Sequence, residues 1–348
     1  MFDLIVIGGG PAGTSAAITS ARAGSRVLLL EQGRFPRQKV CGEFVSAEAL
    51  TLLAWLLDAE HGCVVANVPR IQQARIFSDG LTLTIPVHPA AASITRFELD
   101  AALWRAAKAS GVDARDETKV TGVEGNGPFT VRSDGGTYEA RGVVNASGRW
   151  SRLTAAVDVQ NGARFLGLKA HFAEQDALGS TDLYFFDRGY CGVQPIAPGR
   201  INVCAMVRAG VASKLSGVFE QNPALHARSK HWQVITDPTA TSPLIFRKLC
   251  PTAGGILRAG DAAGFVDPFA GDGISLALRS GHLAARCLLQ PDPAAAYKAA
   301  YFRELAPIFR ANSKVRAVFT LPRILRKAAL ATIAHTPGLA RLLLRTTR

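Results

Sequence analysis

The chain has 348 residues, of which 48% are hydrophobic and 19% are charged, so it is long enough for two domains and too apolar for a disordered protein. Its 40 Lys and Arg residues against 27 Asp and Glu residues give a formal charge of +13, but no dense basic run interleaved with aromatic residues indicates a nucleic-acid partner. The six cysteines form no C-x-x-C pair, which argues against a disulfide framework and a zinc site, and we expect no bound metal.

The opening residues predict a dinucleotide-binding unit. Residues 2–7 (FDLIVI) are typical of a buried parallel strand, an Ala-rich helix follows, and RVLLLE is a second strand that ends at Glu31. Gly8, Gly10 and Gly13 form G-x-G-x-x-G: the first permits the turn, the second lets the backbone approach a pyrophosphate, and the third lets the helix pack on the strand. The helix N-terminus attracts phosphate, and Glu31 suits a ribose but not the 2′-phosphate of NADP, which leaves FAD or NAD. The residues expected at the dinucleotide are Gly8, Gly10, Pro11, Ala12, Gly13, Glu31 and Gln32.

The next stretch, FPRQKVCGEFVS at residues 35–46, resembles the P-x-x-K-x-C-G segment of geranylgeranyl reductases. These enzymes share a superfamily of FAD-dependent oxidoreductases with aromatic hydroxylases of the p-hydroxybenzoate hydroxylase type. The resemblance implies that Arg37 faces FAD phosphate or ribose and that Cys41 and Gly42 approach the isoalloxazine. We interpret Cys41 as a small residue that lets the flavin pass, with a redox-active thiol as the alternative, because no partner cysteine is near it in the sequence. Glu43 is the carboxylate best placed for acid–base catalysis if this loop lies at the flavin.

Two further stretches resemble the same superfamily. In ITRFELDAALWRAAKASGV (94–112), Arg96 precedes an amphipathic helix, and the resemblance places it near the FAD phosphates; an arginine that only begins a helix is the alternative. YEARGVVNASGRWSRLT (138–154) resembles the D-G-x-x-S-x-x-R signature of aromatic hydroxylases, with Ser147 in place of the acid and Thr154 in place of the arginine. The departure weakens the case for direct NAD(P)H handling, and NAD(P)H is retained as the expected transient electron donor.

The middle of the chain predicts an antiparallel substrate sheet, because period-two apolar segments alternate with Asp-Gly and Pro-Gly turns. Within it, DRGYCGVQPIAPG (187–199) resembles the G-Y-x-W-x-F-P strand that lines the prenyl tunnel of geranylgeranyl reductases. Gly192 replaces the Trp and Gln194 the Phe, so we expect a roomier and more polar pocket. Tyr190 is a candidate substrate contact, with a core tyrosine as the alternative.

The stretch LRAGDAAGFVDPFAGDGISLALRSGHLAA (257–285) resembles the second flavin fingerprint of the superfamily and selects FAD over NAD. The resemblance implies that Asp261 binds the ribityl or pyrophosphate region and that the following loop lies along the isoalloxazine. The N-terminus of the next helix would then stabilise negative charge on the reduced flavin. The residues carried over as FAD contacts are Gly260, Asp261, Pro268, Gly271, Gly273 and Ile274.

The expected fold is α/β: a Rossmann-like FAD-binding domain of the geranylgeranyl reductase type, an inserted antiparallel sheet and a helical C-terminal tail. The predicted segments are 1–64, 94–154 and 251–300 for the FAD-binding domain, 65–93 and 155–250 for the substrate domain, and 301–348 for the tail.

The tail from Leu305 to Arg348 contains nine basic residues and no acidic one, interleaved with apolar residues. Amphipathic basic helices of this kind lie on anionic bilayers, and helices that close the substrate domain with a basic rim are the alternative. No basic n-region precedes the first strand, so we expect no signal peptide, and no run of about 18 uncharged apolar residues predicts a spanning helix. We therefore expect a cytoplasmic protein with peripheral contact to the inner face of the membrane; the sequence does not address the oligomeric state.

The resemblance implies an FAD-dependent enzyme with a small lipophilic substrate. The first hypothesis is a monooxygenase that hydroxylates a lipophilic aromatic, quinone-type or polyketide-type metabolite through a flavin C4a-hydroperoxide. The alternative is a flavin ene-reductase of C=C bonds in prenyl chains or similar lipids, which the Cys-Gly stretch and basic tail favour and the missing tunnel aromatics oppose. A third hypothesis is a flavoprotein that modifies a partner protein. Candidate catalytic residues are Glu43, Cys41 and Tyr190, while His88, His171 and His282 are candidates by residue type only, with a structural role as the alternative.

Overall fold

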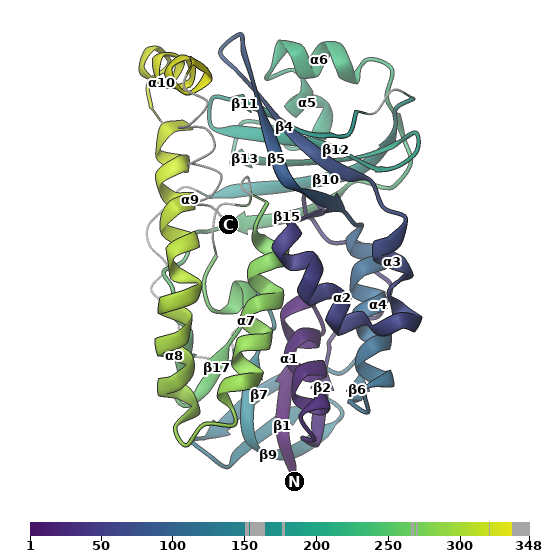
Figure 1. Cartoon of the computed structure of the whole chain (residues 1–348), viewed down its shortest axis with the longest axis vertical. Helices are drawn as coiled ribbons and strands as arrows, with labels where there is room; N and C mark the ends of the chain where they lie inside the picture. Colours follow the sequence, from purple (N-terminus) through teal and green to yellow (C-terminus); the bar gives the residue numbers. More distant parts are fainter. Residues whose placement is uncertain are drawn as a thin grey trace.

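The computed structural model describes residues 1–149, 153, 164–175, 178–265, 268, 271–319 and 321–335. These residues form two β-sheets with helices on their outer faces, one sheet in each half of an elongated molecule (Figure 1). The predicted signature residue Thr154 and the tail from Arg341 to Arg348 lie outside the described residues.

Sheet A forms the half that contains the N-terminus, and its centre is parallel. Strands β17, β9, β1, β2 and β6 lie side by side in this order and all run in the same direction. Because the carboxyl ends of parallel strands meet at one edge, the loops that follow β1, β2, β9 and β17 gather there. The strands of sheet A are β1 (Phe2–Ile7), β2 (Val27–Leu30), β6 (Asp113–Arg115), β7 (Val120–Gly125), β8 (Phe129–Ser133), β9 (Gly136–Asn145), β16 (Thr252–Ala253) and β17 (Ile256–Arg258).

The helices of this half cover sheet A with small residues at close contacts. A Cβ at Gly281 in α7 would lie 2.0 Å from the backbone oxygen of Ala12 in α1, so the two helices touch backbone to backbone. The Ser15 hydroxyl also donates to the Leu278 carbonyl at 2.7 Å. This packing holds α1 and α7 together, near the edge where the strand-end loops gather. The helices are α1 (Pro11–Arg22), α2 (Ala47–His61), α3 (Cys63–Ala66), α4 (Arg96–Ala109), the short 3-10 turn η1 (Gly260–Ala262) and α7 (Gly273–Cys287).

Sheet B forms the other half and departs from the antiparallel expectation at one pair of strands. Strands β4 and β11 pair in parallel, with Thr181 opposite Ala74 and Leu183 opposite Ile76. No hairpin constrains this pair, since more than a hundred residues separate the two strands, and a long crossover permits the parallel direction. The strands are β3 (Phe44–Val45), β4 (Arg70–Ser78), β5 (Leu81–Ser93), β10 (Phe165–Ala173), β11 (Ser180–Phe186), β12 (Gly189–Ala197), β13 (Arg200–Arg208), β14 (Gln233–Val234) and β15 (Thr239–Leu244).

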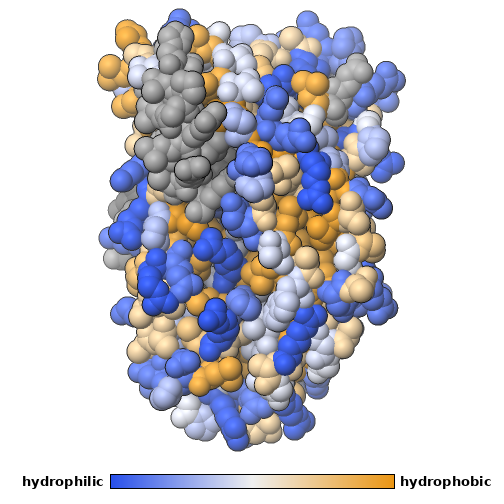
Figure 2. All heavy atoms as spheres, viewed as in Figure 1, coloured by the Kyte–Doolittle hydropathy of each residue, from blue (hydrophilic) through white to orange (hydrophobic). Residues whose placement is uncertain are grey.

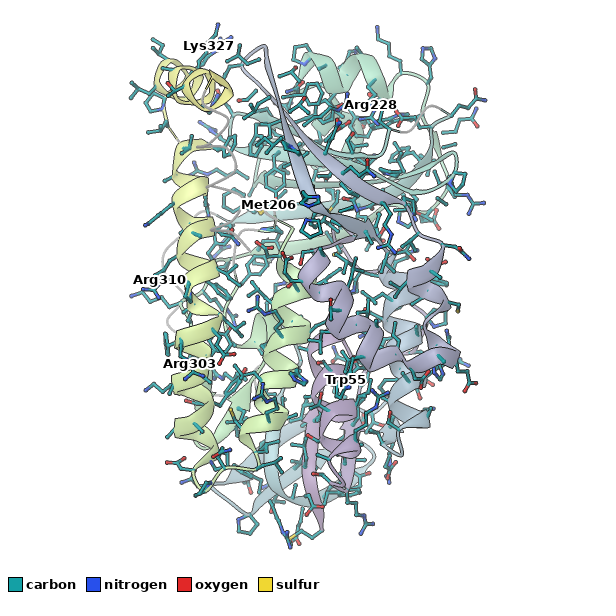
Figure 3. All side chains as sticks on the ribbon, viewed as in Figure 1. Trp55, Met206, Arg228, Arg303, Arg310 and Lys327 are labelled. Carbon is teal, nitrogen blue, oxygen red and sulfur yellow. The ribbon has the colours of Figure 1, made fainter. Side chains whose placement is uncertain are left out.

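The two halves share short segments across the predicted domain boundaries. Phe44–Val45, which the sequence analysis assigned to the FAD-binding domain, forms β3 and pairs with β5 of sheet B. The outer face of sheet B is covered by α5 (Leu215–Phe219) and α6 (Pro223–Ser229), where Arg228, labelled in Figure 3, bonds Glu174 and Asp182. The opposite, inner face of sheet B is turned toward sheet A and lines the cavity described below.

The C-terminal helices run along one side of both halves (Figure 1). They are α8 (Pro293–Glu304), α9 (Ala306–Phe319) and α10 (Arg323–His335). The buried Arg326 of α10 donates to both carboxylate oxygens of Asp79 at 2.7 and 2.9 Å, which attaches this helix to the β4–β5 turn. Helices α9 and α10 therefore pack beside sheet B, and contact of their basic residues with a membrane stays a prediction. Within the described part of the chain, no helix is both long and apolar enough to cross a bilayer.

Candidate active site

One continuous cavity of about 600 Å³ lies between the carboxyl edge of sheet A and the inner face of sheet B. Figure 2 shows apolar side chains gathered across the middle of the molecule, at the level where the two halves meet. The structure brings all of the predicted FAD contacts except Gly13 to its wall: Gly8, Gly10, Pro11, Ala12, Glu31, Gln32, Arg37, Cys41, Gly42, Arg96, Gly260, Asp261, Pro268, Gly271, Gly273 and Ile274.

The glycines of these loops have two different roles. One allows a helix to pack closely on a strand, and three leave space beside the backbone for a ligand. A Cβ at Gly13 would lie 1.7 Å from the Gly8 carbonyl oxygen, so Gly13 lets α1 pack on β1 and does not reach the cavity. A Cβ at Gly10 would meet only Arg96 Nη2, at 4.0 Å, and one at Gly42 or Gly273 would meet no described atom within 4 Å. The backbone at these three positions is therefore open to a bulky group, which fits a cofactor that lies against the main chain.

Two helix N-termini meet this open space without a side-chain cap. Gly10 precedes α1, and Asp272 precedes α7, and neither makes a side-chain cap hydrogen bond. Asp272 instead accepts a hydrogen bond from Asn312 of α9 at 3.1 Å. The first-turn N–H groups and the positive ends of both helix dipoles thus suit a ligand with two separate sites of negative charge, such as a pyrophosphate and a reduced flavin.

Glu31 is buried and held as an ionised acceptor. Its carboxylate accepts the Gly9 N–H at 2.7 Å, the Gly33 N–H at 2.8 Å and Arg37 Nη1 at 2.7 Å. Burial alone would raise the pKa of Glu31, but Arg37 and these two amides together hold it below its ordinary value. A carboxylate fixed in this way at the cavity wall can accept ribose hydroxyls.

Arg96 does more than begin a helix, because its guanidinium lies beside Gly10 at the cavity wall. It is oriented by Asp100, one turn along α4, through two hydrogen bonds of 2.7 and 2.6 Å. Burial would lower the pKa of Arg96, but Asp100 raises it above the ordinary value. The group stays charged next to the glycine loop, which fits phosphate binding.

Glu43 lies at the centre of a fully buried polar cluster. Its Oε1 accepts Lys169 Nζ and the Arg96 backbone N–H, the latter at 2.8 Å, and its Oε2 lies 2.9 Å from His171 Nε2. Burial would raise the pKa of Glu43, but His171 and Lys169 hold it below its ordinary value. The carboxylate therefore fixes the loop to sheet B, and its lowered pKa makes it a poor proton donor. The sequence analysis did not single out Lys169, although a lysine two residues before a histidine in an apolar strand signals a buried partner.

The remaining predicted residues lie in different places: Cys41, Tyr190 and Asp261 line the cavity, and His282 does not. Cys41 Sγ accepts the Glu43 backbone N–H at 3.3 Å, and Tyr190 is buried beside Phe185, with ring centroids 5.6 Å apart. Asp261 lies 3.5 Å from Arg149, a residue that the sequence analysis missed because the family signature was degenerate there. His282 contacts Thr19 at 3.1 Å, away from the cavity lining.

The half of the cavity under sheet B is mostly apolar and ends at α9. Lys314, Val318 and Phe319 of α9 line it, and Phe319 stacks on Phe185 at 3.8 Å. The sequence analysis missed them because the tail pattern showed amphipathic helices but not what they cover. The sheet residues that line this half are Ala74, Ile76, Leu83, Ile85, Val87, Gly167, Thr181, Leu183, Tyr190, Gly192, Gln194, Cys204, Ala205, Met206, Thr241 and Leu244.

Comparisons with known proteins agree with this geometry. The sequence profile of the FAD dependent oxidoreductase family matches residues 3–157. The chain is 30% identical to a digeranylgeranylglycerophospholipid reductase of Methanoculleus marisnigri over 312 residues, which cover 82% of this chain and 76% of that protein. The chain belongs to the FAD-dependent oxidoreductases of the geranylgeranyl reductase and aromatic hydroxylase type. Its cofactor is FAD, as the sequence predicted.

Further relatives and solved structures are similar to this chain over nearly its whole length. A menaquinone reductase of Mycolicibacterium smegmatis is 26% identical over 374 residues, with 95% of this chain and 90% of that protein covered. Among solved structures, a flavin-dependent brominase superposes with a TM-score of 0.83 at 21% identity, covering 99% of this chain and 93% of its own. A geranylgeranyl bacteriochlorophyll reductase-like protein of Thermoplasma acidophilum gives a TM-score of 0.78 at 21% identity, with 99% of each chain covered. The Rossmann-like FAD-binding fold is thereby confirmed.

Proposed function

We propose that this FAD-dependent oxidoreductase reduces a carbon–carbon double bond in a lipophilic, isoprenoid-type substrate. The observation that carries the proposal is the continuity of the cavity: the same space is lined by the predicted FAD contacts at one end and by aliphatic and aromatic side chains of sheet B and α9 at the other. The relatives named reductases of a digeranylgeranylglycerophospholipid and of menaquinone support it, since both names describe reduction of a lipid.

In this proposal, each group of residues that lines the cavity has its own role in catalysis. Bound FAD, when fully reduced, would supply both hydrogens of the reduction, one as a hydride and one as a proton. The N-termini of α1 and α7 bind and stabilise negative charge, and Glu31 and Arg96 fix the dinucleotide end. The apolar half under sheet B excludes water and orients the chain of the substrate. Glu43 stays ionised, so we assign it the positioning of the loop around Cys41 and not the delivery of a proton.

Anaerobic turnover tests this proposal. The holoenzyme reduced with dithionite should convert geranylgeraniol to a product heavier by two hydrogen atoms, detected by mass spectrometry. Heat-denatured enzyme with free FAD is the control. Full flavin reduction with no product from geranylgeraniol or from menaquinone would refute the proposal.

The monooxygenase, which was the first hypothesis from the sequence, is the second candidate here. Gly192 and Gln194 favour it, because they make the pocket wider and more polar than a tunnel for a bare prenyl chain requires. It predicts oxygen consumption with NAD(P)H, release of peroxide without substrate, and a product heavier by one oxygen atom. NAD(P)H is the proposed electron donor in both cases.

A further inference from the structure

The inner face of sheet B is graded from polar to aromatic along its strands. Strand register places His171 opposite Asn202, and Asn202 opposite Gln194, in one row. The next row contains Lys169, whose Nζ is bound to Glu43, opposite Cys204, and Cys204 opposite Gly192; the third contains Tyr190 opposite Met206. Figure 3 labels Met206 at the level where the two halves meet. The pocket therefore has a polar row at one end and an aromatic row at the other.

The polar row lies at the flavin end. Gln194 Nε2 donates to Ser93 Oγ at 2.7 Å, and Ser93 pairs with Phe44 between β5 and β3. The Phe44 ring in turn packs against the backbone of Gly271: a Cβ at Gly271 would lie 2.6 Å from the Phe44 ring. Asn202 Nδ2 donates to the Cys41 carbonyl at 3.1 Å, which ties the same row to the Cys41 loop.

The polar row retains unused hydrogen-bonding capacity. Gln194 is only 3% exposed and lines the cavity; its Nε2 uses one of its two N–H groups, on Ser93, and its Oε1 accepts no hydrogen bond from the described residues. Oδ1 of the neighbouring Asn202 is buried without a donor among the described residues, but Asn202 does not line the cavity, so Gln194 is the residue of this row that a ligand can reach. The cavity-facing amide of Gln194 can therefore form a further hydrogen bond with a ligand, and a ligand that forms it gains affinity.

The middle row leaves a passage between the two ends. A Cβ at Gly192 would meet Leu183 Cδ2 at 3.5 Å and the Cys204 carbonyl at 3.6 Å, which are ordinary contacts. The backbone there does not require glycine, so the absent side chain adds volume to the cavity. Beyond it, Tyr190, Phe185 and Phe319 form the aromatic end that α9 closes.

We propose that the substrate is amphiphilic: an oxygen-bearing head hydrogen-bonds to Gln194 beside the flavin, and an apolar chain passes under Gly192 to the aromatic end at α9. The inference rests on the proposed function, because it orients the lipophilic substrate of that same pocket. It identifies Gln194 as a specificity-determining residue and predicts that the reacting bond lies near the head of the molecule.

Equilibrium binding to the oxidised holoenzyme tests the orientation without turnover. The probes are farnesol, farnesal and farnesene, which share a chain and differ in the head: hydroxyl, carbonyl or none. Titrations followed by the flavin absorbance give the dissociation constants. Gln194→Leu should weaken farnesol or farnesal about five- to tenfold, the worth of one neutral hydrogen bond, and leave farnesene unchanged. Whichever oxygenated probe is affected identifies the head as hydroxyl or carbonyl.

Two further variants complete the test. Gln233→Leu, at an exposed glutamine of β14, is the matched control and should bind all three probes like the wild type. Gly192→Leu should weaken all three at least tenfold, because its side chain fills the passage. Flavin content and melting temperature show whether each variant is folded, and Gln194→Met replaces Gln194→Leu if the latter is not.

Equal weakening of all probes by Gln194→Leu, or unchanged binding in Gly192→Leu, would overturn the orientation and leave the proposed reduction intact. Failure of every probe to bind the wild type would count against the proposed function itself, and the orientation would fall with it.

Discussion

Two glycines three residues apart should respond in opposite ways to the same substitution. A methyl group at Gly13 would lie 1.7 Å from the Gly8 carbonyl oxygen, half of the 3.4 Å at which ordinary contact begins. Relief requires α1 to move away from β1, and overpacking of this kind costs about 3 kcal/mol. At about 2–4 °C per kcal/mol, Gly13→Ala should lower the melting temperature of the apoprotein by roughly 6–12 °C.

Gly10→Ala should leave the apoprotein intact and impair only the cofactor site. Gly10 has φ −75°, which any residue adopts, and its methyl group would meet one atom at 4.0 Å. A Gly→Ala change at a compatible backbone position is neutral or stabilises by about 0.4–1 kcal/mol. The methyl group fills the space where the backbone approaches a pyrophosphate, so we expect FAD binding to weaken at least about tenfold, or 1.4 kcal/mol.

The assay compares both variants after removal of the flavin. Circular dichroism gives the melting temperature of each apoprotein, and quenching of flavin fluorescence gives the FAD dissociation constant. The reasoning is refuted if Gly10→Ala binds FAD like the wild type, or if both variants lower the apoprotein melting temperature equally.

Three other predictions concern the buried ion pairs and the C-terminal helices. Glu43→Gln leaves Lys169 charged and buried without its counter-ion, so denaturant titration at pH 7 should show a loss of about 3–5 kcal/mol. Because the pKa of Glu43 is lowered in the folded protein, its stabilisation is present above about pH 4.3 and is lost as the pH falls through the lowered value; a difference that stays constant into acid contradicts this. Asp79→Asn removes the charge that Arg326 contacts, and trypsin should cleave α10 faster than in the wild type, whereas an unchanged cleavage rate would show that the pair does not hold this helix. Ile324 is 82% exposed on the basic helix α10, so Ile324→Asp should reduce co-flotation with phosphatidylglycerol vesicles, and equal flotation would exclude this face from membrane contact.

Local sequence rules predicted the elements that form the wall of the predicted FAD site, because each depends on neighbours along the chain. The glycine loop, the Ala-rich helix and Glu31 follow one another within a single strand–helix–strand unit, and the structure forms each where expected. Arg96 is the first residue of its helix, which begins one residue earlier than the sequence predicted, and only its partner Asp100, four residues later, was needed to explain its orientation. The antiparallel pairing of β4 with β5 followed from period-two apolarity and an Asp-Gly turn.

The substrate half could not be predicted in this way, because its residues meet only in three dimensions. Glu43 contacts Lys169 and His171, which lie 126 and 128 residues further along the chain. Phe319 belongs to a tail whose composition suits a membrane surface as well as a pocket wall, and only its stacking on Phe185 distinguishes the two.

The sequence by itself determined that a dinucleotide is bound and that it is FAD, since backbone shape and helix ends are set by short stretches of chain. Only the tertiary structure decided which side chains share a cavity with the predicted FAD contacts. Which side chains share a cavity depends on strand register and helix packing, and those are fixed by the burial of the whole molecule.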